Sequence, residues 1–153
     1  RRPPRSTQGV SSAASDVYKR QNFEATFAAF RENWLYTGDI AYRDRDGFIY
    51  IVDRAKDMAI VSGFNVFPRE IDEILMAHPH IKEAASIAVP DAEKGEAIKA
   101  FVCLNDGSNL TEDKIKDYCR EDLVGYKVPK QIVFREALPK TPVGKIDKNQ
   151  LRE

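Results

Sequence analysis

Short runs of apolar residues between positions 56 and 153 predict a small β-sheet. Four runs are rich in Val, Ile and Ala and are bounded by turn-forming or charged residues, which is typical of strands. They lie at residues 58–61, 84–89, 98–104 and 132–134. Gly63 leaves the backbone free to turn after the first run, and the acidic segment 90–96 connects the second run to the third.

A first helix is predicted between the first and second strands. Pro68 suits the first helical turn, where its missing N–H costs nothing. Ile71, Ile74 and Leu75 follow with the spacing of one helix face. Burying each of these side chains contributes about 1.5–3 kcal/mol. We expect Pro79 to stop this helix.

A second helix is predicted to begin after Thr111, whose hydroxyl can accept a hydrogen bond from the first turn. Its apolar face consists of Ile115, Tyr118, Cys119 and Leu123. We expect Gly125 to end it. With the four strands, the two helices predict an α+β unit over residues 56–153, large enough to fold alone.

The preceding stretch, residues 22–55, is too small to form a core of its own. Residues 23–30 are apolar enough for a short helix. Two β-prone runs, 40–43 and 48–52, flank an Asp-Arg-Asp-Gly turn and predict a β-hairpin. Since a single hairpin is at best marginally stable, this stretch must complete its fold against other protein.

Residues 1–21 differ in composition from the rest of the chain. They contain five basic residues and one acid among Pro, Ser, Ala and Gly, with no helical or strand period. One interpretation is a basic arm that binds an anionic partner. The other is a disordered or foreign segment, because SSAASDVYKRQ resembles translated sequencing-adapter sequence. The composition favours the second interpretation.

Charge and composition exclude several classes of protein. The 24 basic residues balance 24 acidic ones, and without residues 1–21 only 19 basic residues face 23 acidic ones, so no nucleic-acid clamp is expected. No apolar run approaches the roughly 18–20 residues that span a bilayer, and no secretory signal is visible. Cys103 and Cys119 are too few for a disulfide framework and are expected in the core. We therefore expect a cytoplasmic protein, with peripheral contact to a membrane as the alternative.

Several charged residues stand where chemistry could occur, but each alone has an ordinary interpretation. Asp39 follows a Thr-Gly turn, Arg54 and Lys56 follow a strand, and Lys145 lies in a Pro-punctuated loop. Taken singly they are a turn residue, solvated charges and a surface lysine. Residues 125–148 carry six basic and two acidic residues, which is either a surface that attracts phosphates or a solvated basic edge.

Two histidines, His78 and His80, flank Pro79 without a carboxylate-rich or cysteine partner at ligand spacing. We therefore expect no metal site and place these histidines at a helix C-terminus.

Five motifs occur in a fixed order, and together they contain the charged residues Asp39, Arg54, Lys56 and Lys145. They are WLYTGD at 34–39, DRAKD at 53–57, VSGFNVFPREI at 61–71, GYKVPK at 125–130 and LPKTPVGK at 138–145. In this order they resemble the C-terminal part of the adenylate-forming (AMP-binding) superfamily, which includes acyl-CoA synthetases, peptide-synthetase adenylation domains and beetle luciferases. The segment SGFNVFPRE is most similar to long-chain fatty acyl-CoA ligases.

The resemblance implies a fold and an activity. The fold would be a small mixed β-sheet with flanking helices, with residues 22–55 as the tail of a large N-terminal AMP-binding domain and 56–153 as a mobile C-terminal domain. The activity would use ATP and Mg²⁺ to convert a fatty acid into an acyl-adenylate, and would then pass the acyl group to coenzyme A.

The resemblance also implies a role for each of five residues. Asp39 and Arg54 would bind the ribose hydroxyls of the nucleotide. Lys56 would be the hinge between the two domains. Gly63 would line the coenzyme A channel, where the lack of a Cβ lets a ligand approach the backbone. Lys145 would contact carboxylate and phosphate oxygens during adenylation.

The phosphate-binding loop, the acyl pocket and most of the adenine site would lie upstream of these residues. We therefore expect this chain alone to have no ligase activity, only weak affinity for nucleotide and no tightly bound cofactor; its main partner would be the N-terminal domain. Two alternatives stay open at this point: an adenylation domain that loads a carrier protein, and a non-catalytic α+β interaction module.

Overall fold

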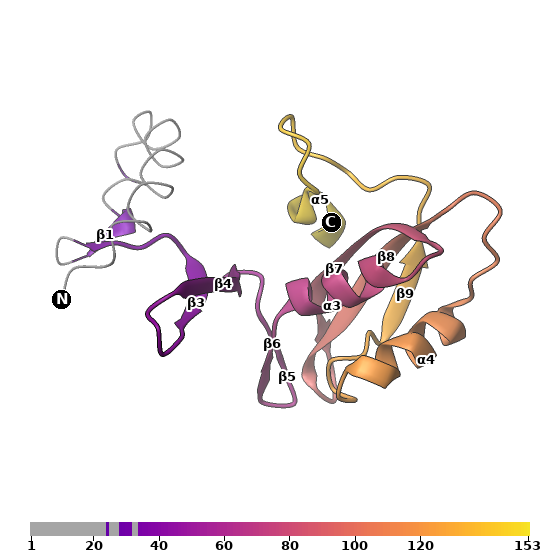
Figure 1. Ribbon diagram of the computed structural model, residues 1–153, viewed down its shortest axis with the longest axis horizontal. Coiled ribbons are helices and arrows are strands. Elements are labelled where there is room, and N and C mark those ends of the chain that lie inside the picture. Colours follow the sequence, from indigo (N-terminus) through magenta and orange to yellow (C-terminus); the bar gives the residue numbers. More distant parts are fainter. Residues whose placement is uncertain (1–23, 25–27, 32–33) are drawn as a thin grey trace. The chain divides into compact units, whose positions relative to one another are not determined.

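The computed structural model describes residues 24, 28–31 and 34–153 (Figure 1). The chain divides into two compact units, residues 1–39 and residues 40–153. Among the described helices, none combines the length and the apolar character needed to cross a lipid bilayer.

In the first unit, a pair of two-residue strands is described. Strand β1 (Phe30–Arg31) pairs antiparallel with β2 (Trp34–Leu35). The predictions for residues 1–21 lie outside the described residues, as does half of the helix expected at residues 23–30. Of the described half, Glu24, Ala28 and Ala29 are helical as expected, whereas Phe30 belongs to β1.

The predicted β-hairpin is confirmed. It consists of β3 (Asp39–Arg43) and β4 (Ile49–Arg54). Asp44 closes the turn, because its N–H donates to the carbonyl of Phe48 at 3.0 Å and its Oδ1 accepts from the N–H of Phe48 at 2.8 Å. Gly47 adopts a φ of 94°, which few other residues tolerate.

A five-stranded mixed sheet forms the centre of the second unit. Its strands are β5 (Ala59–Val61), β6 (Phe64–Val66), β7 (Ile81–Asp91), β8 (Gly95–Leu104) and β9 (Gln131–Phe134). Their order is β6-β5-β8-β7, with β9 also paired to β8. β9 runs parallel to β8 and the other pairs are antiparallel. The four predicted strands are present, and β6 is an additional one.

Strands β7 and β8 are longer than their apolar runs predicted, because the segment between them folds into a tight turn. Asp91 Oδ1 accepts hydrogen bonds from the N–H groups of Glu93 and Lys94, at 3.1 and 3.0 Å. Pairing therefore continues to Asp91 opposite Gly95. Most of the predicted connector 90–96 belongs to the two strands.

Both predicted helices are present. α3 (Pro68–Ala77) begins at its proline, and His78 caps its C-terminus, as expected for that histidine. α4 (Glu112–Asp122) is capped by Thr111, whose side chain accepts from the N–H of Lys114.

The predicted end of α4 was wrong. The helix ends at Asp122, three residues before the expected stop, and Leu123 is already extended and buries its side chain in the core. Gly125 is not among the glycines with positive φ, so it does not form the left-handed cap that was expected.

A third helix of the second unit, α5 (Lys148–Arg152), was not predicted. Asp147 caps it, with Oδ1 accepting from the N–H of Asn149 at 3.1 Å. With five residues it has only one buried side chain, Leu151, so its sequence carries no helical period.

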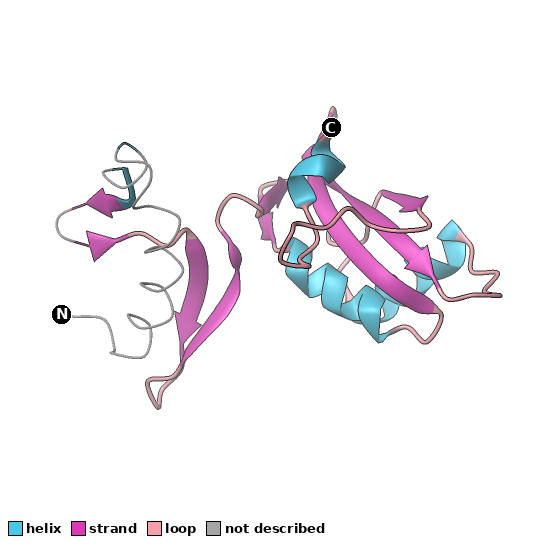
Figure 2. Ribbon diagram, turned by 90° about the horizontal axis from the view of Figure 1, so that it is seen from above, coloured by secondary structure: helices cyan, strands magenta, loops and turns pink. Residues whose placement is uncertain are grey.

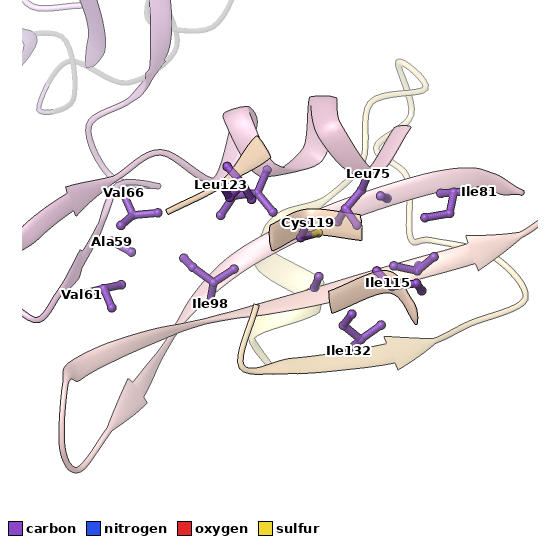
Figure 3. Packing of buried hydrophobic residues seen from close by; sticks show 14 residues of the cluster. Ala59, Val61, Val66, Leu75, Ile81, Ile98, Ile115, Cys119, Leu123 and Ile132 are labelled. Atoms are coloured by element: carbon purple, nitrogen blue, oxygen red, sulfur yellow. The ribbon is translucent and has the colours of Figure 1, made fainter. Parts of the chain in front are cut away.

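The sheet has an apolar cluster on each face. One cluster lies under α3 and α4 and includes Leu75, Ile115, Cys119 and Ile98 (Figure 3). Alternate residues of β8 point the other way, and there Phe101 packs with Leu138 and Leu151. Accordingly α5 covers the face opposite α3 and α4 (Figure 2).

Both cysteines lie in this core, as predicted. Cys119 belongs to the cluster under the helices and Cys103 to the opposite one. Burial raises the pKa of the Cys119 thiol to about 11, so this residue is an inert apolar group at neutral pH.

Candidate functional site

The five predicted site residues, four that would contact ligands and the hinge residue Lys56, all lie at strand ends or in loops, and all five are exposed. Asp39 begins β3 and belongs to the first unit, whereas the other four belong to the second. Arg54 ends β4 and Lys56 lies in the turn that follows. Gly63 lies between β5 and β6, and Lys145 lies in the loop before α5.

The residues around Lys56 are held by two buried carboxylates. Asp53 Oδ2 accepts from the N–H of Arg69 at 3.0 Å, so the end of β4 caps the first turn of α3. Its Oδ1 accepts from the N–H of Arg54 at 2.7 Å. A carboxylate at a helix N-terminus is favoured by the helix dipole. Asp57 pairs with Arg152 of α5 at 2.6 Å.

Gly63 is the second residue of a two-residue hairpin turn. Ser62 and Gly63 have φ values of 51° and 83°, the combination found in type I′ turns. Apart from its chain neighbours Ser62 and Phe64, no described residue has an atom within 4 Å of a Cβ built on Gly63, so the space beside it is open. A ligand could therefore approach the backbone here, as the predicted role requires.

An aromatic pair beside Gly63 was missed by the sequence reasoning. The rings of Phe64 and Tyr126 stack with centroids 4.6 Å apart, and Phe64 is 55% exposed. Both residues belong to motifs that resemble the superfamily. Their pairing was not visible because the two positions are far apart in sequence.

Lys145 is presented by a closed loop. The N–H of Thr141 donates to the carbonyl of Lys145 at 2.7 Å, and the N–H of Gly144 donates to the carbonyl of Thr141 at 2.9 Å. At the base, the N–H of Asp147 donates to the carbonyl of Pro139 at 2.8 Å. The loop extends beyond α5 (Figure 1), and Val143 at its tip is 78% exposed. The ammonium group is thus directed into solvent rather than into the domain's own core.

Lys145 differs from the other lysines of the basic stretch 125–148. Four of them pair with acids outside that stretch: Lys127 with Glu70, Lys130 with Asp91, Lys140 with Glu83 and Lys148 with Asp72. Among the described residues, none gives the Lys145 ammonium an acidic partner. The stretch is therefore largely neutralised within the domain, which favours the solvated-edge interpretation. Of its two other basic residues, Arg135 lies over the ring of Phe101, whereas Lys145 is exposed in its loop.

The Lys130–Asp91 pair attaches the segment after α4 to the β7–β8 turn. Hydrogen bonds from Lys130 and from the N–H groups of Lys94 and Glu93 lower the pKa of Asp91 from 3.8 to about 2, and Asp91 raises the pKa of Lys130. Because the pKa of Asp91 is lower in the folded state, the ionised carboxylate stabilises the fold at neutral pH.

We expect Asp91→Asn to lower the thermal unfolding midpoint at neutral pH. The difference from the unchanged protein should shrink as the pH falls from about 4 through 2, since only below the folded-state pKa is the carboxylate protonated in both states. Thermal melts by circular dichroism at several pH values measure this. Asp106→Asn, in the exposed loop after β8, is the control. A difference that persists unchanged down to the lowest pH at which the protein folds would contradict the assignment.

The described residues contain no group of three or more His, Cys, Asp or Glu side chains that could hold a metal ion.

Comparisons with known proteins identify the domain. The AMP-binding enzyme C-terminal domain family matches residues 70–145. A long-chain-fatty-acid–CoA ligase of Salmonella typhimurium is 51% identical over 133 residues, which are 87% of this chain and 24% of that protein. The chain thus spans about a quarter of the length of the curated relatives it matches.

Solved structures agree with this assignment. A Mycobacterium tuberculosis fatty acyl CoA synthetase is 43% identical, with a TM-score of 0.66 over 84% of this chain and 26% of that one. ATP-bound MatB from Rhodopseudomonas palustris is 35% identical, with a TM-score of 0.79 over 86% of this chain and 26% of that one. These matches confirm the resemblance drawn from the five motifs and the predicted α+β fold. The chain belongs to the adenylate-forming (AMP-binding) superfamily, of which it contains the C-terminal domain.

Proposed function

We propose that this chain is the C-terminal portion of an ATP-dependent acyl-CoA synthetase that activates a fatty acid as an acyl-adenylate and transfers it to coenzyme A. The observation that carries the proposal is the exposed Lys145, which lies in a closed loop. The sequence around it is 51% identical to that of a long-chain-fatty-acid–CoA ligase. The substrate class rests on those relatives, since the acyl pocket would lie upstream.

Lys145 would supply positive charge during adenylation. Its ammonium group would lie against the carboxylate of the acid and the phosphate oxygens as the new bond forms and pyrophosphate leaves. A fixed cation placed where negative charge develops stabilises the transition state without reorganisation. Asp39 and Arg54 would hold the ribose of the same nucleotide, since a carboxylate can accept hydrogen bonds from hydroxyls and a guanidinium can donate to them.

Transfer to coenzyme A would use a different face of the domain. Gly63, with open space beside it, would line the channel for the thiol-bearing arm. Because Lys145 and Gly63 serve successive steps, the domain would rotate about Lys56 between them. Asp53 lies before the Lys56 hinge and Arg69 lies after it. The hydrogen bond from the Arg69 N–H to the Asp53 carboxylate would therefore form in one orientation of the domain and break in the other.

The division of the chain follows from the same proposal. Residues 22–55 would be the tail of the large domain and 56–153 the mobile one. In support, the β3–β4 hairpin exposes Tyr42, Phe48, Tyr50 and Ile51 by about half or more, which a missing neighbouring domain would cover. The N-terminal domain is therefore the partner that this chain requires.

We expect the isolated chain to show no exchange of labelled pyrophosphate into ATP, with or without a long-chain fatty acid. The full-length protein, with its upstream domain, should show exchange that depends on the fatty acid. A panel of acids of different chain length, amino acids included, measures the substrate class. Exchange by the isolated chain, or a full-length protein that activates only amino acids, would overturn the proposal.

A further inference from the structure

The short helix α5 is held at both ends by ion pairs to distant parts of the domain. At its start, Lys148 Nζ lies 2.8 Å from Asp72 Oδ2 on α3. At its end, Arg152 lies 2.6 Å from Asp57 Oδ1, in the turn after β4. The partners are 76 and 95 residues apart in sequence. Two anchors on a five-residue helix fix both its position and its direction.

Both carboxylates are embedded in the domain. The side chain of Asp72 is 17% exposed and that of Asp57 is 11% exposed. Asp72 Oδ1 also accepts from the N–H of Ser86 in β7 at 2.5 Å. Burial raises the pKa of Asp72 even though the nearby Lys148 opposes this. The desolvation of such a pair offsets much of its attraction, so its main effect is on geometry rather than on stability.

Apolar packing alone would not give this geometry. Leu151 is the one buried side chain of α5 and packs in the cluster with Leu138 and Ile146. A single apolar contact holds a helix near a surface but does not fix its rotation or its register. A five-residue helix is also far too short to be stable by itself. The ion pairs at its two ends supply the missing constraints.

The position of α5 determines the position of Lys145. Lys145 lies three residues before the first residue of α5, and the loop base is closed by the hydrogen bond between Asp147 and Pro139. At the other end, Asp57 directly follows Lys56. The Arg152–Asp57 pair therefore connects the helix behind Lys145 to the residue next to the proposed hinge.

We propose that Arg152 and Asp57, together with Lys148 and Asp72, are positioning residues that hold the Lys145 loop in a fixed relation to the Lys56 turn. A rotation about Lys56 would then carry Lys145 as part of one rigid piece. This inference rests on the proposed function, because it gives Lys145 the adenylation role. In that role the four residues would act through Lys145 rather than on the substrate itself.

The test separates the two half-reactions in the full-length protein. Arg152→Met should lower the rate constant of acyl-adenylate formation about 10-fold, since small displacements of a reacting group have effects of this size or larger. The KM for ATP and the transfer of acyl from preformed acyl-adenylate to coenzyme A should change less than about twofold. Asp57→Asn should have the same effect. Arg152→Lys should retain most of the rate of acyl-adenylate formation. The double variant that exchanges the charges, Asp57→Arg with Arg152→Asp, should also retain most of it.

Two controls make the result interpretable. Lys116 pairs with Glu112 on α4 at 2.7 Å, remote from α5, and Lys116→Met should leave both half-reactions unchanged. Lys145→Ala, assayed in parallel, tests the proposed function itself: if it spares adenylation, that function fails whatever Arg152→Met does. If Lys145→Ala strongly lowers the rate of adenylation while Arg152→Met and Asp57→Asn do not lower it, or lower both half-reactions equally, the positioning role is overturned. Should Arg152→Met fail to fold, Arg152→Lys and the exchanged pair decide by the same comparison.

Discussion

Replacing Lys145 with alanine in the full-length protein should lower the rate of acyl-adenylate formation by about 10²–10³-fold. Two unit charges 4 Å apart interact by about 4 kcal/mol at an effective dielectric constant near 20, and each 1.36 kcal/mol corresponds to tenfold in rate. The loop leaves the ammonium group exposed and without an acidic partner among the described residues, so its charge is available for a nucleotide. Exchange of labelled pyrophosphate into ATP measures this step.

The same variant should keep its ability to transfer acyl from preformed acyl-adenylate to coenzyme A, because that step would use the face near Gly63. Lys114→Ala on the exposed surface of α4 is a matched control and should change neither step. Lys145→Arg, which keeps the charge but alters its shape, should retain part of the adenylation rate. Equal losses in both half-reactions for Lys145→Ala would contradict the division of labour between the two faces.

The regular part of the fold could be predicted because its signals are local. The apolar stripe of Ile71, Ile74 and Leu75, bounded by two prolines, predicted α3. The apolar run of β8 predicted a buried strand, and its successive side chains are buried on opposite faces of the sheet. Strand β6 and helix α5 were missed for the opposite reason. Three and five residues are too few to show a period, and both elements form because the rest of the domain offers them a partner.

The candidate site likewise has features that the sequence could predict and features that it could not. The motifs identified the candidate residues, and these lie at strand ends and in turns and loops, where ligands can reach them. The sequence could not predict what holds those turns in place, since Asp57 meets Arg152 across 95 residues and Glu70 meets Lys127 across 57. Such pairs follow from the completed fold, and no local pattern identifies which acid faces which base.

Replacing Phe101 with alanine should destabilise the domain by about 3–5 kcal/mol, which is typical of removing a buried phenylalanine. Phe101 is 2% exposed and is the largest side chain of the cluster beneath Leu138 and Leu151. Lys99 and Arg135 also lie 5.1 and 5.0 Å from its ring centre, so two cation–π contacts are lost with it. Because small domains are stable by only about 5–15 kcal/mol, urea unfolding should show a large shift in midpoint.

This loss should also release one particular part of the chain. The cluster around Phe101 supports α5 and the base of the Lys145 loop, so trypsin should cleave the C-terminal segment of Phe101→Ala earlier than the rest of the domain. Leu75→Ala, on the opposite face under α3, should destabilise the fold without this preference. Phe101→Leu should destabilise the domain less than Phe101→Ala, and it should also advance the cleavage of the C-terminal segment less. If Phe101→Ala and Leu75→Ala gave the same order of cleavage, the two faces would unfold as one unit, and the C-terminal loop would not depend on its own cluster.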